Sequence, residues 1–116
     1  MKNLEVKFRL WIDTKDGNSV IGDGRWRLLE TIEKTGSLTS ACKKLGISYR
    51  KAWGDLAEMQ DALKIPLFEK HRGGKKGGDT HLTEFGIKFI KTYKKLHKEI
   101  EKAVEESMRV NFGPIK

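Results

Sequence analysis

Apolar and polar side chains alternate near the N-terminus of the chain. A period of two residues is typical of a strand that buries one of its faces. Asp16 and Gly17 follow as a hairpin turn, and residues 19–21 provide a short return strand. The pattern therefore predicts a β-hairpin within residues 3–22, whose alternating apolar set is Leu4, Val6, Phe8, Leu10 and Ile12.

From residue 24 to residue 63 the apolar spacing changes to three and four residues, which is the period of amphipathic helices. We expect a first helix over about residues 25–35, a short second helix over 38–45 and a third helix over 49–63. Glycines after the first two helices suit left-handed helix ends. The expected caps are Asp23 or Gly24, Ser37 and Ser48, and the expected glycine ends are Gly36 and Gly46.

Residues 64–82 are predicted to form a wing, in which Pro66 ends helical structure and a glycine- and lysine-rich loop joins two short strands. Thr83 then caps a long helix over residues 83–110. Its apolar spacing of four and three fits either a helix folded back on the core or a seam with a second copy of the chain. The apolar line is longer than the rest of the chain can cover, which favours a dimer seam made by Phe89, Tyr93, Leu96, Ile100 and Ala103.

These elements predict one domain over residues 1–116, mainly α with small β elements. Within residues 37–53 a short helix, a tight glycine turn and a serine-capped helix follow one another as in a helix-turn-helix. We therefore predict a winged helix-turn-helix with an N-terminal β-hairpin (3–22), a tri-helical core (24–63), a wing (64–82) and a long C-terminal dimerisation helix (83–110).

The charge of the chain favours a polyanionic partner. Its 116 residues include 24 lysines and arginines against 16 acidic residues, a formal net charge of +8. The single cysteine excludes an internal disulfide and fits a reducing compartment. No secretion leader and no membrane-spanning apolar run are visible, so we expect a cytoplasmic protein with no membrane partner.

The first turns of the third helix carry side chains that suit a groove-reading helix. Tyr49, Arg50 and Lys51 are polar or cationic while the opposite side is apolar, and arginine is the best single reader of guanine. The loop from Arg72 to Lys76 places three cations within five residues, where they could neutralise phosphates. Ordinary solvated charges and a loop without a partner are the alternative interpretations of these two segments.

Sequence signals of catalysis are missing. Cys42 occupies a small-residue position in a packing helix and has no neighbouring histidine. His71, His81 and His97 lack the spacing of metal ligands, and there is no Walker loop. We therefore expect no enzymatic activity, no cofactor and no metal site.

Several segments resemble the N-terminal DNA-binding domain of ModE-type molybdate-responsive regulators, a branch of the LysR-like winged helix-turn-helix group. The resemblance covers about residues 6–100, and residues 48–53 favour the ModE branch over other LysR-like proteins. The most specific segments are residues 24–30, 35–37, 45–53, 73–75 and 82–86, whereas residues 66–70 are shared more widely across the group.

The resemblance implies a homodimer that binds double-stranded DNA through the third helix and the wing. It places Ser48, Tyr49, Arg50 and Lys51 at the DNA-reading positions, Arg72, Lys75 and Lys76 at the wing, and Thr39 and Ser40 near phosphate.

Full-length members also carry a C-terminal pair of small β domains that bind molybdate, and residues 111–116 are too short to form them. We therefore expect a stand-alone regulator without its own molybdate sensor, a regulator that borrows a separate sensor chain, or a piece of a longer protein.

The expected function is that of a homodimeric, sequence-specific, double-stranded-DNA-binding transcriptional regulator. Two alternatives stay open. A winged helix can dock an acidic protein partner, and an architectural protein can bind duplexes without sequence preference.

Overall fold

The computed structural model describes residues 3–71 and 79–115. It is mainly helical with two small antiparallel strand pairs, which confirms the predicted fold class. No helix within these two ranges is both long and apolar enough to cross a membrane. The elements in chain order are β1 (Ile12–Asp13), β2 (Ser19–Ile21), α1 (Asp23–Thr35), α2 (Leu38–Leu45), α3 (Tyr49–Leu63), β3 (Phe68–His71), β4 (Asp79–Leu82) and α4 (Glu84–Phe112).

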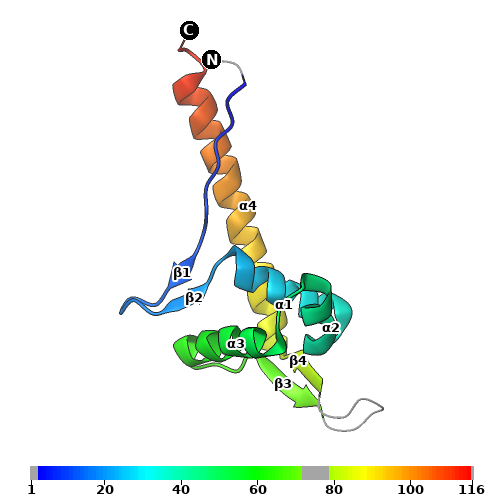
Figure 1. Cartoon of the computed structure of the whole chain (residues 1–116). Helices are drawn as coiled ribbons and strands as arrows, with labels where there is room; N and C mark the ends of the chain where they lie inside the picture. Colours follow the sequence, from blue (N-terminus) through cyan, green and yellow to red (C-terminus); the bar gives the residue numbers. More distant parts are fainter. Residues whose placement is uncertain (1–2, 72–78, 116) are drawn as a thin grey trace.

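The first three helices form the centre of the molecule, and both strand pairs and α4 pack around them (Figure 1). α1 contacts α2, α3 and α4, so it lies at the middle of the helical packing. β3 and β4 pair in register from Phe68 opposite Leu82 to His71 opposite Asp79. Buried aliphatic side chains fill the interior: Ile21, Leu28, Leu29, Ile32, Leu38, Leu56, Met59 and Leu67.

Local hydrogen bonds define where the helices begin. The Ser37 and Ser48 hydroxyls each accept a hydrogen bond at 3.0 Å from the backbone amide three residues later, as predicted. The start of α1 differs from the prediction, because Gly22 occupies the cap position and no side chain caps it. Asp23 lies in the first turn instead, where its carboxylate is 3.0 Å from the Tyr93 hydroxyl.

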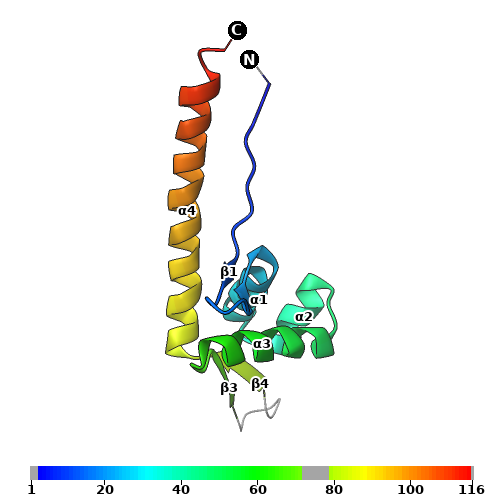
Figure 2. The ribbon, with the colours of Figure 1, turned by 90° about the vertical axis from the view of Figure 1, so that its left-hand side faces the viewer.

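The N-terminal strand is much shorter than the alternating pattern predicted. Only Ile12–Asp13 pairs with β2; residues 3–11 run extended beside α4, with no strand partner among the described residues (Figure 2). A ladder needs a neighbouring strand, and the turn at Gly17 returns only three residues to it. The predicted apolar face packs in part on α4 instead, where the Phe8 ring stacks on His97 with 4.9 Å between ring centroids.

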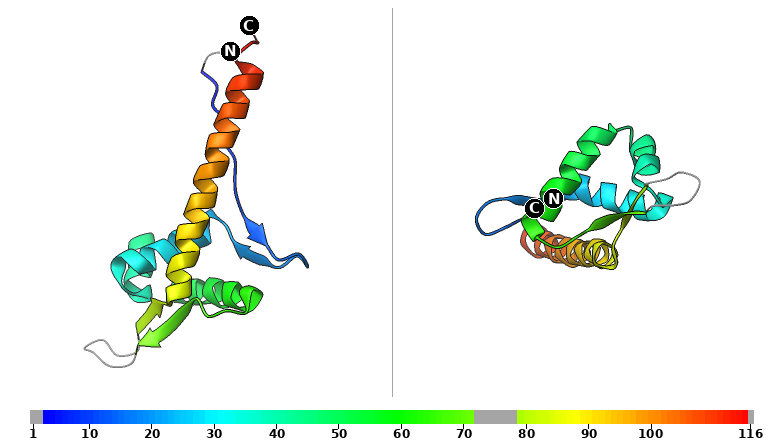
Figure 3. Two further views of the ribbon diagram at one scale, coloured as in Figure 1. Left: turned by 180° about the vertical axis from the view of Figure 1, so that it is seen from behind. Right: turned by 90° about the horizontal axis from the view of Figure 1, so that it is seen from below.

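α4 extends well beyond the core, and the described part of the chain begins and ends near the far end of this helix (Figures 1 and 3). Its first turn packs tightly on the segment before β3, since a Cβ added to Gly86 would lie 2.3 Å from the Leu67 carbonyl oxygen. Ile90 and Tyr93 are buried in the turns that follow. The core therefore holds α4 by its N-terminal turns.

Candidate nucleic-acid interface

α3 presents its first turns to solvent beside the wing strands (Figure 1). Ala52 and Leu56 are buried, and the helical period places Arg50 on the opposite, outer side. Tyr49 is 45% exposed and Arg50 is also exposed. Across residues 3–71 and 79–115 no ion pair engages Arg50, so its guanidinium is available to an acceptor outside the chain.

Lys51 is held inside a charged network. Its ammonium lies 3.2 Å from the Asp55 carboxylate, one turn further along α3. Asp55 is also 3.3 Å from the guanidinium of Arg25 in α1. Arg25 donates to the Val20 carbonyl oxygen at 3.2 Å and pairs with Glu58. The Arg25 side chain is only 16% exposed, and through it this network links β2 and α1 to α3.

A chain of aromatic rings joins α3 to the wing. The Trp53 ring makes edge contacts with Tyr49 and Phe68, at 6.1 and 5.1 Å between ring centroids. The Lys70 ammonium lies 5.4 Å from the Trp53 ring, a cation–π contact. Phe68 and Lys70 were not among the predicted site residues. Their signal was an aromatic and a cation on alternate positions of the strand that opens the wing.

The other residues predicted to meet DNA have different surroundings. Thr39 is exposed in the first turn of α2, whereas Ser40 is half-buried and its hydroxyl accepts a hydrogen bond at 2.9 Å from the capping serine. Cys42 is buried, and its burial raises the pKa of the thiol. The predicted wing cations Arg72, Lys75 and Lys76 lie outside the described residues.

The described ranges offer no arrangement of three or more histidine, cysteine, aspartate or glutamate side chains suited to a metal ion.

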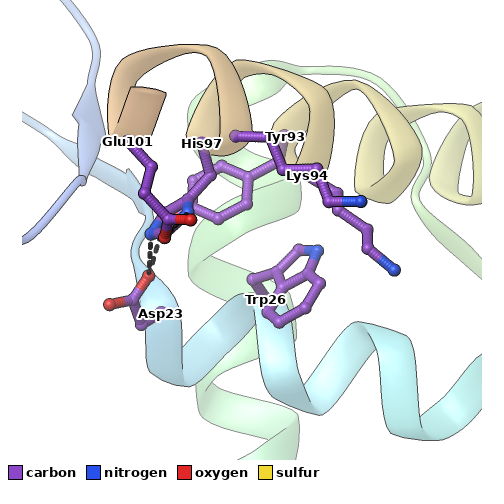
Figure 4. A pocket seen from close by; sticks show the side chains of 7 residues that line it. Asp23, Trp26, Tyr93, Lys94, His97 and Glu101 are labelled. Atoms are coloured by element: carbon purple, nitrogen blue, oxygen red, sulfur yellow. Dashed lines mark hydrogen bonds and ion pairs between the residues drawn. The ribbon is translucent and has the colours of Figure 1, made fainter. Parts of the chain in front are cut away.

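The junction between α1 and α4 is built around Tyr93. Its hydroxyl lies 2.8 Å from the Leu10 carbonyl oxygen, and its ring meets Trp26 with 6.1 Å between centroids. Burial, and then the hydrogen bond with Asp23, raise the pKa of the Tyr93 hydroxyl above its usual value. A cavity of about 230 Å³ opens beside these rings, where His97 of α4 points toward Asp23 (Figure 4). Tyr93, one of the predicted dimer residues, thus makes its contacts within its own chain.

The remaining predicted dimer residues follow one side of α4. Leu96 is 37% exposed and Ala103 is exposed, while Phe89 and Ile100 are half-buried. Their spacing of seven, four and three residues keeps them on one side of the helix. A different side carries a row of lysines. These are Lys91, Lys94, Lys95, Lys98 and Lys102.

The sequence is similar to those of known proteins. A family model described as the bacterial regulatory helix-turn-helix protein, lysR family, matches residues 24–87, from α1 into α4. The chain is 36% identical over 104 residues to the molybdenum transport protein ModE of Azotobacter vinelandii, covering 89% of this chain and 38% of that protein. It is 35% identical over 109 residues to the transcriptional regulator ModE of Haemophilus influenzae, covering 89% and 39%.

The DNA-binding transcriptional dual regulator ModE of Escherichia coli is 37% identical over 81 residues, covering 70% of this chain and 31% of that protein. The chain thus spans between 31% and 39% of the length of these three curated relatives. The predicted resemblance to ModE-type regulators is confirmed by these matches. Since the family model covers more than half of the sequence, the chain belongs to the lysR family of bacterial regulatory helix-turn-helix proteins.

Proposed function

We propose that this chain acts as a homodimeric, sequence-specific, double-stranded-DNA-binding transcriptional regulator. The observation that carries the proposal is the exposed start of α3 beside the wing, where Arg50 has no ion pair within the described ranges and Tyr49 rests on Trp53. A helix with polar first turns beside a β-wing suits entry into the major groove. Relatives named as transcriptional regulators support the same role.

The residues would divide the work of recognition. Arg50 donates two hydrogen bonds to a guanine, and Tyr49 contacts a neighbouring base or sugar. Lys51 exchanges Asp55 for a phosphate, and Thr39 hydrogen-bonds to another phosphate. The wing cations Arg72, Lys75 and Lys76 add contacts that do not depend on sequence.

A second copy of the chain would pack against the apolar side of α4. Leu96 is the most exposed large side chain on this predicted seam. Two-fold pairing would set the two α3 helices roughly 34 Å apart, which is one turn of the duplex.

Selection of bound duplexes from a random pool at near-physiological salt tests the proposal. The expected result is a palindromic motif with half-sites about one helical turn apart. Enrichment without a motif, with steep salt dependence, would instead indicate an architectural binder. A folded protein that enriches no duplex would contradict the proposal and favour the protein-docking alternative.

Arg50→Ala should weaken binding to the selected duplex by about 1–3 kcal/mol and relax the preference at one position, because a bidentate base contact is lost. Binding isotherms on the selected duplex and its single-base variants measure both effects. Arg9→Ala is the matched control, since Arg9 is an exposed arginine on the N-terminal segment. Unchanged affinity and specificity in Arg50→Ala would remove Arg50 from the base-reading role.

A further inference from the structure

Gly54 occupies an unfavourable place for a glycine. It lies in the interior of the 15-residue helix α3 and is exposed. A glycine at such a position lowers a folding equilibrium constant about fivefold relative to alanine, because it loses more backbone freedom on folding. With glycine at position 54, α3 is therefore less stable than it would be with alanine there.

The packing of the chain does not require this glycine. Apart from its two chain neighbours and the nearby backbone of its own helix, a Cβ added to Gly54 would meet no atom of the described residues within 4 Å. Its φ is also outside the left-handed region, unlike that of Gly46 in the turn before α3. Gly86 is the opposite case, because there an added Cβ collides with backbone. The space over Gly54 is therefore open to something outside the chain.

The position of Gly54 indicates what approaches it. It follows Arg50 by one helical turn, so both lie on the outer side of α3. The residues on its flanks are held by other elements, Asp55 by Arg25 and Trp53 by Phe68. The helix therefore carries no side chain at position 54, between two flanks held by other elements and next to the arginine proposed to read a base.

We propose that Gly54 sets the depth at which α3 enters the major groove, by letting the duplex contact the helix backbone at this turn. The inference rests on the proposed function, because it takes duplex DNA as the partner. A base contact by Arg50 needs nitrogen–oxygen distances of about 2.7–3.2 Å. A methyl group at position 54 would hold the helix away from the groove and lengthen these distances. Gly54 is thus a positioning residue that acts through Arg50.

The test compares wild type with Gly54→Ala and Gly54→Leu on the duplex selected above and on a random duplex, together with thermal unfolding. Gly54→Ala should raise the melting temperature by about 4 °C, because alanine favours the helix. Its affinity for the selected duplex should fall about tenfold, since an added methyl group overpacks a close contact. Gly54→Leu should lower this affinity further. The affinity for the random duplex should fall much less, because non-specific binding depends on phosphate contacts.

Gly24→Ala is the matched control. Gly24 is an exposed glycine of α1 at which an added Cβ also meets nothing within 4 Å, so this variant should leave DNA binding unchanged. If neither substitution at position 54 changes the affinity for the selected duplex, the inference is wrong while the proposed function stands. The same holds if both duplexes lose affinity equally. A wild-type protein that binds no duplex would overturn the proposed function, and this inference with it.

Discussion

The two cationic side chains at the start of α3 differ in their ion pairing. Arg50 is exposed and enters a complex without giving up an ion pair within the described ranges. Lys51 must first leave Asp55, and such a partly exposed pair contributes only about 0.2–1 kcal/mol. Asp55 also pairs with Arg25 at 3.3 Å, so its carboxylate keeps a partner when Lys51 leaves. Its negative charge would therefore remain beside the residues proposed to read bases and would oppose binding to phosphates in the wrong position.

Asp55→Asn should release Lys51 and increase affinity for a random duplex at low salt. One more free cation should steepen the dependence of log affinity on log salt by about 0.9. Fluorescence anisotropy titrations at several salt concentrations measure this slope. Asp61→Asn removes the same charge from an exposed position on α3 and serves as the control. Identical slopes for the two variants would show that Asp55 does not restrain Lys51.

The starts of α2 and α3 could be predicted from the sequence because their causes are local, whereas the start of α1 has no side-chain cap. The Ser37 and Ser48 caps bond to amides three residues away, so a short stretch of sequence contains both partners. The prediction of a long N-terminal strand was wrong because a strand depends on a distant partner. The alternation there marks a face that is only partly covered, because Phe8 stacks on His97 of α4 whereas Leu4 and Val6 are exposed.

In the candidate site, too, the features with local causes could be predicted from the sequence, and those that depend on distant residues could not. The exposure of Tyr49 and Arg50 at the start of α3 could be predicted from the cap and the helical period, which are both local properties of the chain. The contact of Arg25 with Asp55 joins residues 30 positions apart, and no sequence spacing signals it. The burial of Tyr93 likewise depends on Leu10 and Asp23, which come from the other end of the chain.

Gly86→Ala should destabilise the fold by about 1–3 kcal/mol, because the added Cβ forces the first turn of α4 away from the Leu67 backbone. The Cβ would lie 2.3 Å from the Leu67 carbonyl oxygen and 3.3 Å from the Leu82 side chain. Urea unfolding measures the loss. Gly24→Ala, at an open position of α1, should cost nothing. Equal stability of the two variants would contradict the close packing of α4 on Leu67.

At the scale of the whole molecule, α4 has an apolar side and a lysine side. The apolar side is buried against the core at Ile90 and Tyr93 and is more exposed further along, at residues such as Leu96. The opposite side carries the row of lysines that includes Lys98. Pairing through the apolar side would leave the lysines facing solvent, so dimer formation and surface charge can be altered separately.

Leu96→Glu should convert the proposed dimer to the 13.3 kDa monomer, because it places a charge in the seam. Sedimentation equilibrium measures the mass. Affinity for the palindromic duplex should fall, while affinity for a single half-site should persist. Lys98→Glu makes a charge change on the lysine side and should remain dimeric. A dimeric Leu96→Glu protein would place the seam elsewhere.

The length of α4 makes it a lever. Its 29 residues extend about 43 Å at the helical rise, while its N-terminal end is packed closely against the core at the turn around Gly86. If α4 tilts by about 5° at its N-terminal end, its C-terminal end moves by about 4 Å. In the proposed dimer, a contact that fixed the far ends of the two α4 helices would therefore also fix the spacing and rotation of the two α3 helices. A partner bound at those ends would then favour some half-site spacings over others without touching the duplex.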